Sequence, residues 1–136
     1  MEYKKFYSDF LQATLHGVVI NGDKPKDVKK CLKLLRGIAP DASANLDKEE
    51  IANSKGWCIY EHPKTHVIII NTDQDIRIGP EDSPTKTLHH ECKHFMHHEL
   101  QSICQQPTPH HELEYRLSDW AFRKISSMDY FQGLLK

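Results

Sequence analysis

The sequence predicts a small α+β domain in which a short antiparallel or mixed sheet packs on helices. Three observations support this class. Apolar residues recur at helical spacing in the N-terminal third, two β-rich runs follow each other in the middle, and helical patterning returns after residue 83. The 136 residues suit one compact core. No repeat or linker divides them, so we expect residues 1–136 to form a single domain.

The composition is that of an ordinary globular protein. The net charge is -1, with 27% charged and 38% apolar residues, so no basic excess predicts binding to nucleic acid or to an anionic membrane. No apolar run reaches membrane-spanning length, and the first residues lack the apolar core of a secretory signal. The four cysteines lack CxxC pairing, which is typical of reduced thiols. We therefore expect a cytoplasmic location, although a chain released without a signal peptide would look the same.

The N-terminal third predicts three helices. Residues 3–16 place apolar side chains at near-helical spacing and predict an amphipathic helix whose inward side chains are Phe6, Phe10, Leu11 and Leu15. Pro25 suits the first position of a second helix, which Gly37 ends. Asp47 is the expected N-cap of a short helix over 48–53, because Glu50 follows three residues later as in a capping box.

The middle of the chain predicts strands. Residues 56–61 and 66–71 are β-rich runs separated by a short segment with Pro63, which is a hairpin signal. Residues 75–79 could form a third short strand. Ser83 then suits an N-cap and Pro84 the first position of a long helix, which we expect to continue to about residue 103.

Two prolines follow, at positions 107 and 109, and predict a loop. A last helix is expected over about residues 111–127, with apolar side chains turned inward at Leu113, Leu117, Trp120, Ala121 and Ile125. A short loop between two helices favours an antiparallel pair, so the start of the last helix should lie near the later part of the preceding one.

The long helix carries the motif around which the functional prediction is organised. His90-Glu91-Cys92-Lys93-His94 reads H-E-x-x-H. On a helix, His90 and His94 lie one turn apart on the same face and can hold one Zn²⁺, while Glu91 can act as general base towards a water beside the metal. Zinc lowers the pKa of such a water from about 16 to about 7, which provides a nucleophile at neutral pH.

A third protein ligand is expected from the last helix or the loop before it. Its carboxylates and histidines are Glu112, Glu114, Asp119, His110 and His111. We favour Glu114, because the apolar side chains of Leu113 and Leu117 flank its face and would turn it inward. The predicted metal ligands are therefore His90, His94 and Glu114, with Glu91 as the catalytic residue.

Other histidines and a cysteine offer weaker alternatives. A second pair, His94 and His98, has helical spacing but lacks a glutamate directly after its first histidine. His111 could stabilise a transition state as a hydrogen-bond donor. Cys92 falls between the two helix faces, and a buried thiol is the better interpretation.

The motif and the segment that supplies Glu114 resemble the zincin metallopeptidases, most closely the ImmA/IrrE-type minimal peptidases. In that family the third ligand lies in the pattern E-x-x-A-[ND]-x-F-A. Residues 114–121 read Glu-Tyr-Arg-Leu-Ser-Asp-Trp-Ala, which matches with Leu, Ser and Trp as substitutions. The family's H-E-L-G-H-x-x-x-H has a counterpart in His98. Lys93 and Cys92 depart from its usual small and apolar residues. The resemblance covers roughly residues 56–127.

The resemblance implies a small zincin-like fold, with the sheet packed on the HExxH helix and its partner helix and with the N-terminal helices added. It further implies that the edge strand before the active helix, here expected at Val67 to Asn71, pairs with an extended substrate. A simple core strand is an equally good interpretation of that run. A regulatory protein is the implied substrate.

The sequence therefore predicts a zinc-dependent endopeptidase that hydrolyses peptide bonds with a metal-activated water. We expect Zn²⁺ as its cofactor and a protein or peptide as its substrate, and neither nucleic acid nor a membrane as a partner. The oligomeric state is unknown. The main alternative is a non-catalytic zincin-like module that binds proteins and whose metal is structural or absent. A purely structural helical domain with a chance motif is the third possibility.

Overall fold

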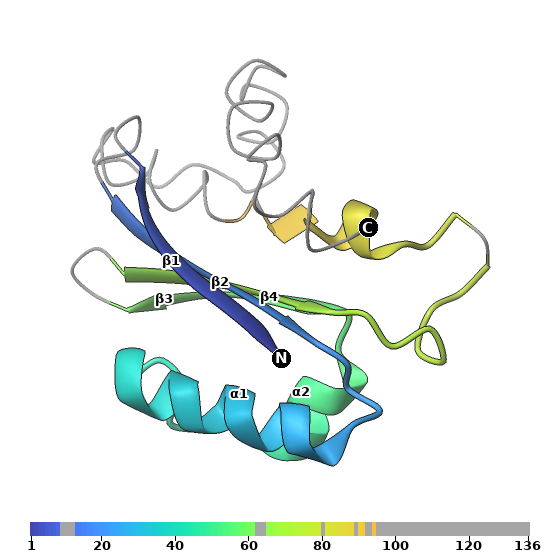
Figure 1. Cartoon of the computed structure of the whole chain (residues 1–136), viewed down its shortest axis with the longest axis horizontal. Coiled ribbons are helices and arrows are strands. Elements are labelled where there is room, and N and C mark those ends of the chain that lie inside the picture. The colour runs from blue at the N-terminus through green and yellow to red at the C-terminus, as the bar shows by residue number, and fades with distance from the viewer. Residues whose placement is uncertain (9–12, 62–64, 80, 89, 92–93, 95–136) are drawn as a thin grey trace.

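The computed structural model describes residues 1–8, 13–61, 65–79, 81–88, 90, 91 and 94. Within them the chain forms a small α+β fold with a four-stranded mixed sheet (Figure 1). In chain order the elements are β1 (Glu2–Ser8), β2 (Ala13–Ile20), α1 (Pro25–Ile38), α2 (Lys48–Asn53), β3 (Gly56–Glu61) and β4 (Thr65–Asn71). Residues 84–88, 90, 91 and 94 are also helical, and we call them the motif helix.

The strand order in the sheet is β1-β2-β4-β3. The outer pairs, β1 with β2 and β3 with β4, are antiparallel, whereas the central pair β2 and β4 is parallel. In that central pair Val18 lies opposite Ile69, and Ile20 lies opposite Asn71. The expectation of an antiparallel or mixed sheet is thus confirmed as a mixed one.

Helices cover both faces of the sheet. Helices α1 and α2 lie on one face and the motif helix on the other (Figure 1). Strand β4 is buried from Val67 to Asn71, as expected of a central strand covered on both sides. Val67 and Ile69 belong to the apolar cluster with α1. Because side chains alternate along a strand, Ile68 and Ile70 face the motif helix.

The two predicted helices that follow β2 are confirmed. Helix α1 begins with Pro25, and its buried stripe consists of Val28, Cys31 and Leu35, at the spacing of one helix face. Helix α2 begins after Asp47, whose Oδ1 accepts a hydrogen bond of 2.8 Å from the backbone N–H of Glu50. Local sequence signals were sufficient for both helices.

The helix predicted over residues 3–16 is wrong, because this region contains strands β1 and β2. The apolar residues that suggested a helical face also fit a strand. From Leu15 to Ile20 the chain is buried throughout, and such a run is typical of a strand covered on both faces. Pairing with β4 supplies the tertiary hydrogen bonds that decide between the two interpretations.

Two further expectations for the middle of the chain are wrong. Residues 75–79 contain no strand: the backbone N–H of Arg77 donates to the Gln74 carbonyl in a turn, and Ile78 is 83% exposed. Residues 67–71 do not form an edge strand either, because β4 is hydrogen-bonded to β2 on one side and to β3 on the other. The edge strand nearest the motif helix residues Thr87 and Glu91 is β3.

The side chain of Asn71 joins three segments at the end of β4. Its Oδ1 accepts from the Gly22 N–H at 2.8 Å, and its Nδ2 donates to the carbonyls of Ala52 and Ser54 at 3.0 and 3.1 Å. A Cβ at Gly22 would lie 2.6 Å from the Ala52 oxygen, so only glycine fits there. This network sets where β3 begins, which matters for the site below.

Candidate active site

The motif helix begins as the sequence predicts. Ser83 Oγ accepts a hydrogen bond of 3.2 Å from the Lys86 N–H, and Pro84 is the first helical residue. The face turned to the sheet carries Thr87, Leu88 and Glu91, which are all buried. A Cβ at Gly56 would lie 2.6 Å from Thr87 Cγ2. The absence of a side chain at Gly56 therefore lets the helix approach β3 closely.

The two motif histidines converge. His90 Nε2 and His94 Nε2 are 2.9 Å apart, and the rings meet edge to face with centroids separated by 4.5 Å. A tetrahedral metal at about 2.05 Å from each nitrogen requires the two nitrogens to be about 3.3 Å apart. Opening the pair by about 0.4 Å needs only a small ring rotation, so two of the donors that zinc prefers are in a suitable arrangement.

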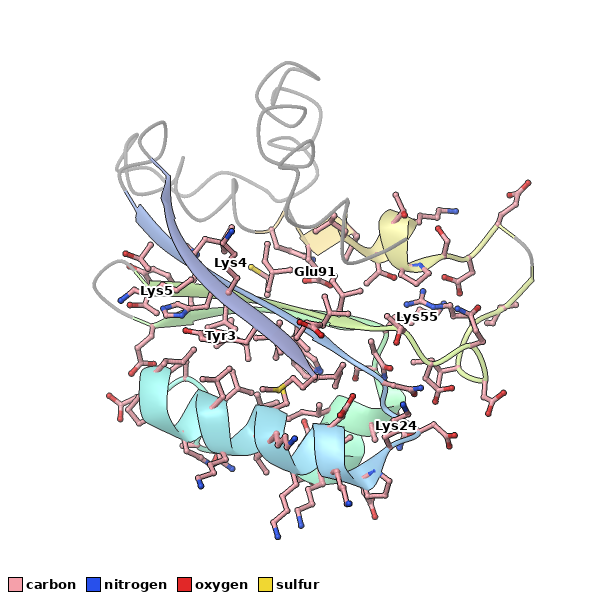
Figure 2. All side chains as sticks on the ribbon, in the orientation of Figure 1. Tyr3, Lys4, Lys5, Lys24, Lys55 and Glu91 are labelled. Carbon is pink, nitrogen blue, oxygen red and sulfur yellow. The ribbon has the colours of Figure 1, made fainter. Side chains whose placement is uncertain are left out.

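Glu91 is 6% exposed and lies between the motif helix and the sheet (Figure 2). Its Cγ is 3.2 Å from the position that a Cβ on Gly56 would occupy. Burial raises the pKa of the Glu91 carboxyl to about 7, because the charged form loses its hydration. A cation held by the neighbouring histidines would lower this pKa, since an opposite charge favours the ionised carboxylate.

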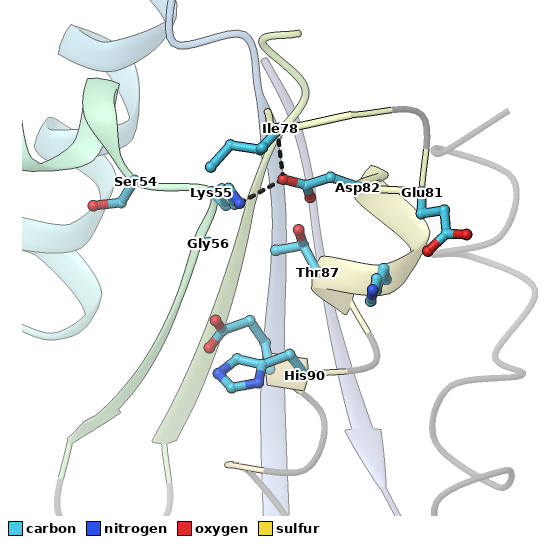
Figure 3. Close-up of a pocket in the computed structure, with 10 residues that line it drawn as sticks. Ser54, Lys55, Gly56, Ile78, Glu81, Asp82, Thr87 and His90 are labelled. Carbon is cyan, nitrogen blue, oxygen red and sulfur yellow. Dashed lines mark hydrogen bonds and ion pairs between the residues drawn. The ribbon is translucent and has the colours of Figure 1, made fainter. Parts of the chain in front are cut away.

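His90 and Glu91 open into a cavity of about 670 Å³. Its other walls come from Lys55, from Gly56 at the start of β3, and from the loop that precedes the motif helix (Figure 3). The cavity therefore brings together one predicted metal ligand, the predicted general base and the end of an edge strand. Its volume lies within the range typical of ligand sites.

Arg77 anchors the loop beside this cavity. Its guanidinium, whose side chain is 2% exposed, donates to Thr87 Oγ1 at 2.9 Å, to Asp82 Oδ1 at 3.1 Å and to the Asn71 carbonyl. It thus links the end of β4, the loop and the motif helix. This role of Arg77 was not predicted from the sequence, where residues 75–79 were a candidate third strand. The signal available was an arginine and an aspartate on either side of Gly79-Pro80.

Asp82 also pairs with Lys55 at the mouth of the cavity (Figure 3). The hydrogen bond from Lys55, with those from the Ile78 N–H and Arg77, lowers the pKa of Asp82 to about 2. The carboxylate stays ionised at neutral pH and is already engaged by cations. It therefore acts as an anchor for the loop.

The remaining predicted site residues lie outside the described residues. These are Glu114, its rivals Glu112, Asp119, His110 and His111, and His98 of the alternative histidine pair. Cys92 and Lys93, which depart from the family pattern, also lie outside the described residues. Elsewhere, Asp23, Asp73 and Asp75 bring carboxylate oxygens within 4.8 Å of one another. That cluster was not predicted, and exposed acidic groups commonly gather without an ion.

Comparisons of the chain with models of protein families, with curated proteins and with solved structures found no match. In the part of the chain that the structure describes, no helix has both the length and the apolar character to cross a membrane.

Proposed function

We propose that this protein is a zinc-dependent endopeptidase with a zincin-like site, in which His90, His94 and Glu114 hold the metal. The observation that carries the proposal is the convergence of His90 and His94 Nε2 at 2.9 Å beside the buried carboxyl of Glu91. Together they provide two metal donors and a proton acceptor, and one of those donors, His90, lines the same cavity as Glu91.

When bound, zinc supplies a Lewis acid that polarises the scissile carbonyl and promotes ionisation of water. Glu91 then serves as general base: a carboxylate oxygen accepts the proton of the attacking water and later donates it to the nitrogen of the leaving amine. A proton acceptor works best when its pKa is near the working pH. Burial raises the pKa of Glu91, and a cation held by the two histidines would lower it.

Strand β3 is the element best suited to hold an extended substrate. Within the described residues it is one of the two edge strands of the sheet, and its first residue, Gly56, lines the same cavity as Glu91. An edge strand offers backbone hydrogen bonds to an added peptide strand. This replaces β4 in the role expected from the sequence. That the substrate is a regulatory protein rests on the resemblance alone.

Metal content tests the ligand set. Protein purified without added zinc should carry about one zinc per chain, and His90→Ala should lose it, as measured by elemental analysis. Glu114→Gln should weaken zinc affinity at least ~10-fold, whereas Glu112→Gln should leave it nearly unchanged, because residues two apart on a helix do not share a face. Metal-free wild type would reject the site, and a damaging Glu112→Gln would reject Glu114 as the ligand.

Glu91→Gln tests the enzyme. It keeps the size of the side chain but removes the base, so zinc and fold should be retained while cleavage falls at least ~10²-fold. Both forms are incubated with cell extract, and the expected result is a protein fragment that appears only with wild type. Equal cleavage by both forms would exclude Glu91 as the base.

One observation favours the alternative of a non-catalytic binding module. At 2.9 Å the two Nε2 atoms are also at hydrogen-bonding distance, so one imidazole can donate to the other without any metal. In that case wild type and Glu91→Gln would capture the same partner equally, and neither would cleave it.

A further inference from the structure

The outer face of α1 is strongly basic in a chain whose net charge is -1. All its exposed charged side chains are cationic: Lys26, Lys29, Lys30, Lys33 and Arg36. The helix contains one acidic residue, Asp27. Its carboxylate is engaged by the N-terminal ammonium group of Met1 at 3.1 Å and by the Asn21 N–H at 3.0 Å. The basic face is therefore not neutralised along its own helix.

This basic face borders a second cavity. A hollow of about 680 Å³ lies between the first turns of α1 and the helix α2. Lysines from both helices line it, Lys26 and Lys29 from α1 and Lys48 from α2, and Glu49 is the one acidic residue in its lining. Pro25, Val28 and Ala52 add an apolar surface between the lysines. We call this hollow the α1–α2 groove.

We propose that the α1–α2 groove docks an acidic segment of a protein partner, which seats an apolar side chain between the lysines. Charge complementarity argues for an anionic partner. The apolar surface of Pro25, Val28 and Ala52 argues for a peptide, because a phosphate backbone would leave that surface uncovered. A membrane is disfavoured since, among the described residues, the large apolar side chains that are exposed are Met1, Tyr3 and Ile78, which lie outside α1 and α2.

The groove is separate from the candidate active site. Helices α1 and α2 cover the face of the sheet opposite the motif helix, and on α1 side chains with nitrogen tips project away from the sheet (Figures 1 and 2). A partner docked there leaves the cavity of His90 and Glu91 open. The proposal therefore does not depend on the proposed function, and zinc-free or cleavage-deficient protein should bind the segment equally well.

Two matched double variants test the groove in the full chain. Lys29→Glu with Lys48→Glu changes two lysines that line it, and Lys30→Glu with Lys33→Glu makes the same charge change outside its lining. The probe is a fluorescent short peptide of glutamate and leucine, followed by anisotropy. The groove variant should lose at least ~10-fold in affinity and the control variant less than ~3-fold, because local contacts outweigh screened long-range charge. Circular dichroism checks that both variants are folded.

Two further comparisons separate the peptide from other polyanions. Replacing leucine by serine in the probe should weaken binding at least ~10-fold, since an apolar side chain buried in a pocket contributes on the order of 1.5–3 kcal/mol. Ala52→Leu, which fills the groove without changing its charge, should also weaken binding of the leucine probe. The proposal is overturned if the serine probe binds as well, if duplex DNA binds more tightly and both double variants weaken it equally, or if no probe binds.

Discussion

The two faces of the sheet are closed in different ways. On the face of α1 and α2, Val28, Cys31 and Leu35 pack against strand residues such as Val67 and Ile69, and these side chains are at most 4% exposed. The opposite face has an apolar contact too, through Leu88. It also buries a carboxyl group, Glu91, and lies beside the nearly buried guanidinium of Arg77.

This difference affects the free energy of packing on the two faces. Burying an ionisable group is costly unless it is paired, and the raised pKa of Glu91 reflects that cost. The buried carboxyl is therefore unfavourable for stability at neutral pH. The α1 face carries no such penalty in its buried apolar cluster.

The largest effect is expected where the packing is purely apolar. Leu35→Ala removes a fully buried side chain and should lower the free energy of unfolding by about 2–5 kcal/mol. Leu34→Ala makes the same change at a partly buried position of the same helix and should lower the free energy of unfolding by less. Urea denaturation measures both. Zinc affinity of the folded fraction should not change, and a change would show that the two faces are coupled.

The second prediction concerns Glu91 in metal-free protein. Its pKa is raised from 4.5 to about 7 in the folded state. The unfolded state therefore loses its proton first, and stability falls as pH rises through this interval. The free energy of unfolding should therefore fall by about 3 kcal/mol between pH 4 and pH 8. Glu91→Gln should abolish that part of the pH dependence, as measured by urea denaturation across the range.

Glu49→Gln, at an exposed position of α2, is the matched control for this prediction and should follow the wild-type profile. If wild type and Glu91→Gln lose stability in parallel between pH 4 and pH 8, Glu91 is not buried as a neutral acid. The contrast between the two faces would then disappear.

The smallest effect is expected at the loop beside the cavity. The pKa of Asp82 is lowered from 3.8 to about 2, chiefly by the hydrogen bond from Lys55. Its contribution to stability is present above pH 4 and is lost as pH falls towards 2, because protonation removes the charge that the cations bind. Asp82→Asn should shift the acid unfolding midpoint slightly upward, as monitored by circular dichroism, whereas Glu81→Gln at the exposed neighbouring position should not.

Local signals predicted those parts of the fold whose hydrogen bonds are local. Pro25 and the apolar stripe of α1, the Asp47 cap and the Ser83-Pro84 start of the motif helix all act within about one helical turn. The convergence of His90 and His94 follows from the same geometry, because residues four apart on a helix share a face. The third ligand, Glu114, stays a prediction because it lies outside the described residues.

The features that the sequence did not predict correctly depend on contacts between residues far apart in the chain. Residues 3–16 have an apolar spacing that fits a helix as well as buried strands, and only the parallel pairing of β2 with β4 decides it. The same pairing makes β4 central and leaves β3 at the edge. Arg77 could not be placed for a related reason: its partners Asn71, Asp82 and Thr87 meet only once the sheet and the motif helix have packed.

The sequence by itself thus determined the α+β class, the helices that cover the sheet and the spacing of the two motif histidines, since each depends on contacts between residues close in the chain. Only the tertiary structure decided which strand forms the edge beside Glu91 and how deeply that carboxyl is buried. The edge follows from the pairing of β2 with β4, and the burial of Glu91 depends on Gly56 admitting the motif helix close to β3. Such a contact between segments more than thirty residues apart is set by packing, and local periodicity carries no information about it.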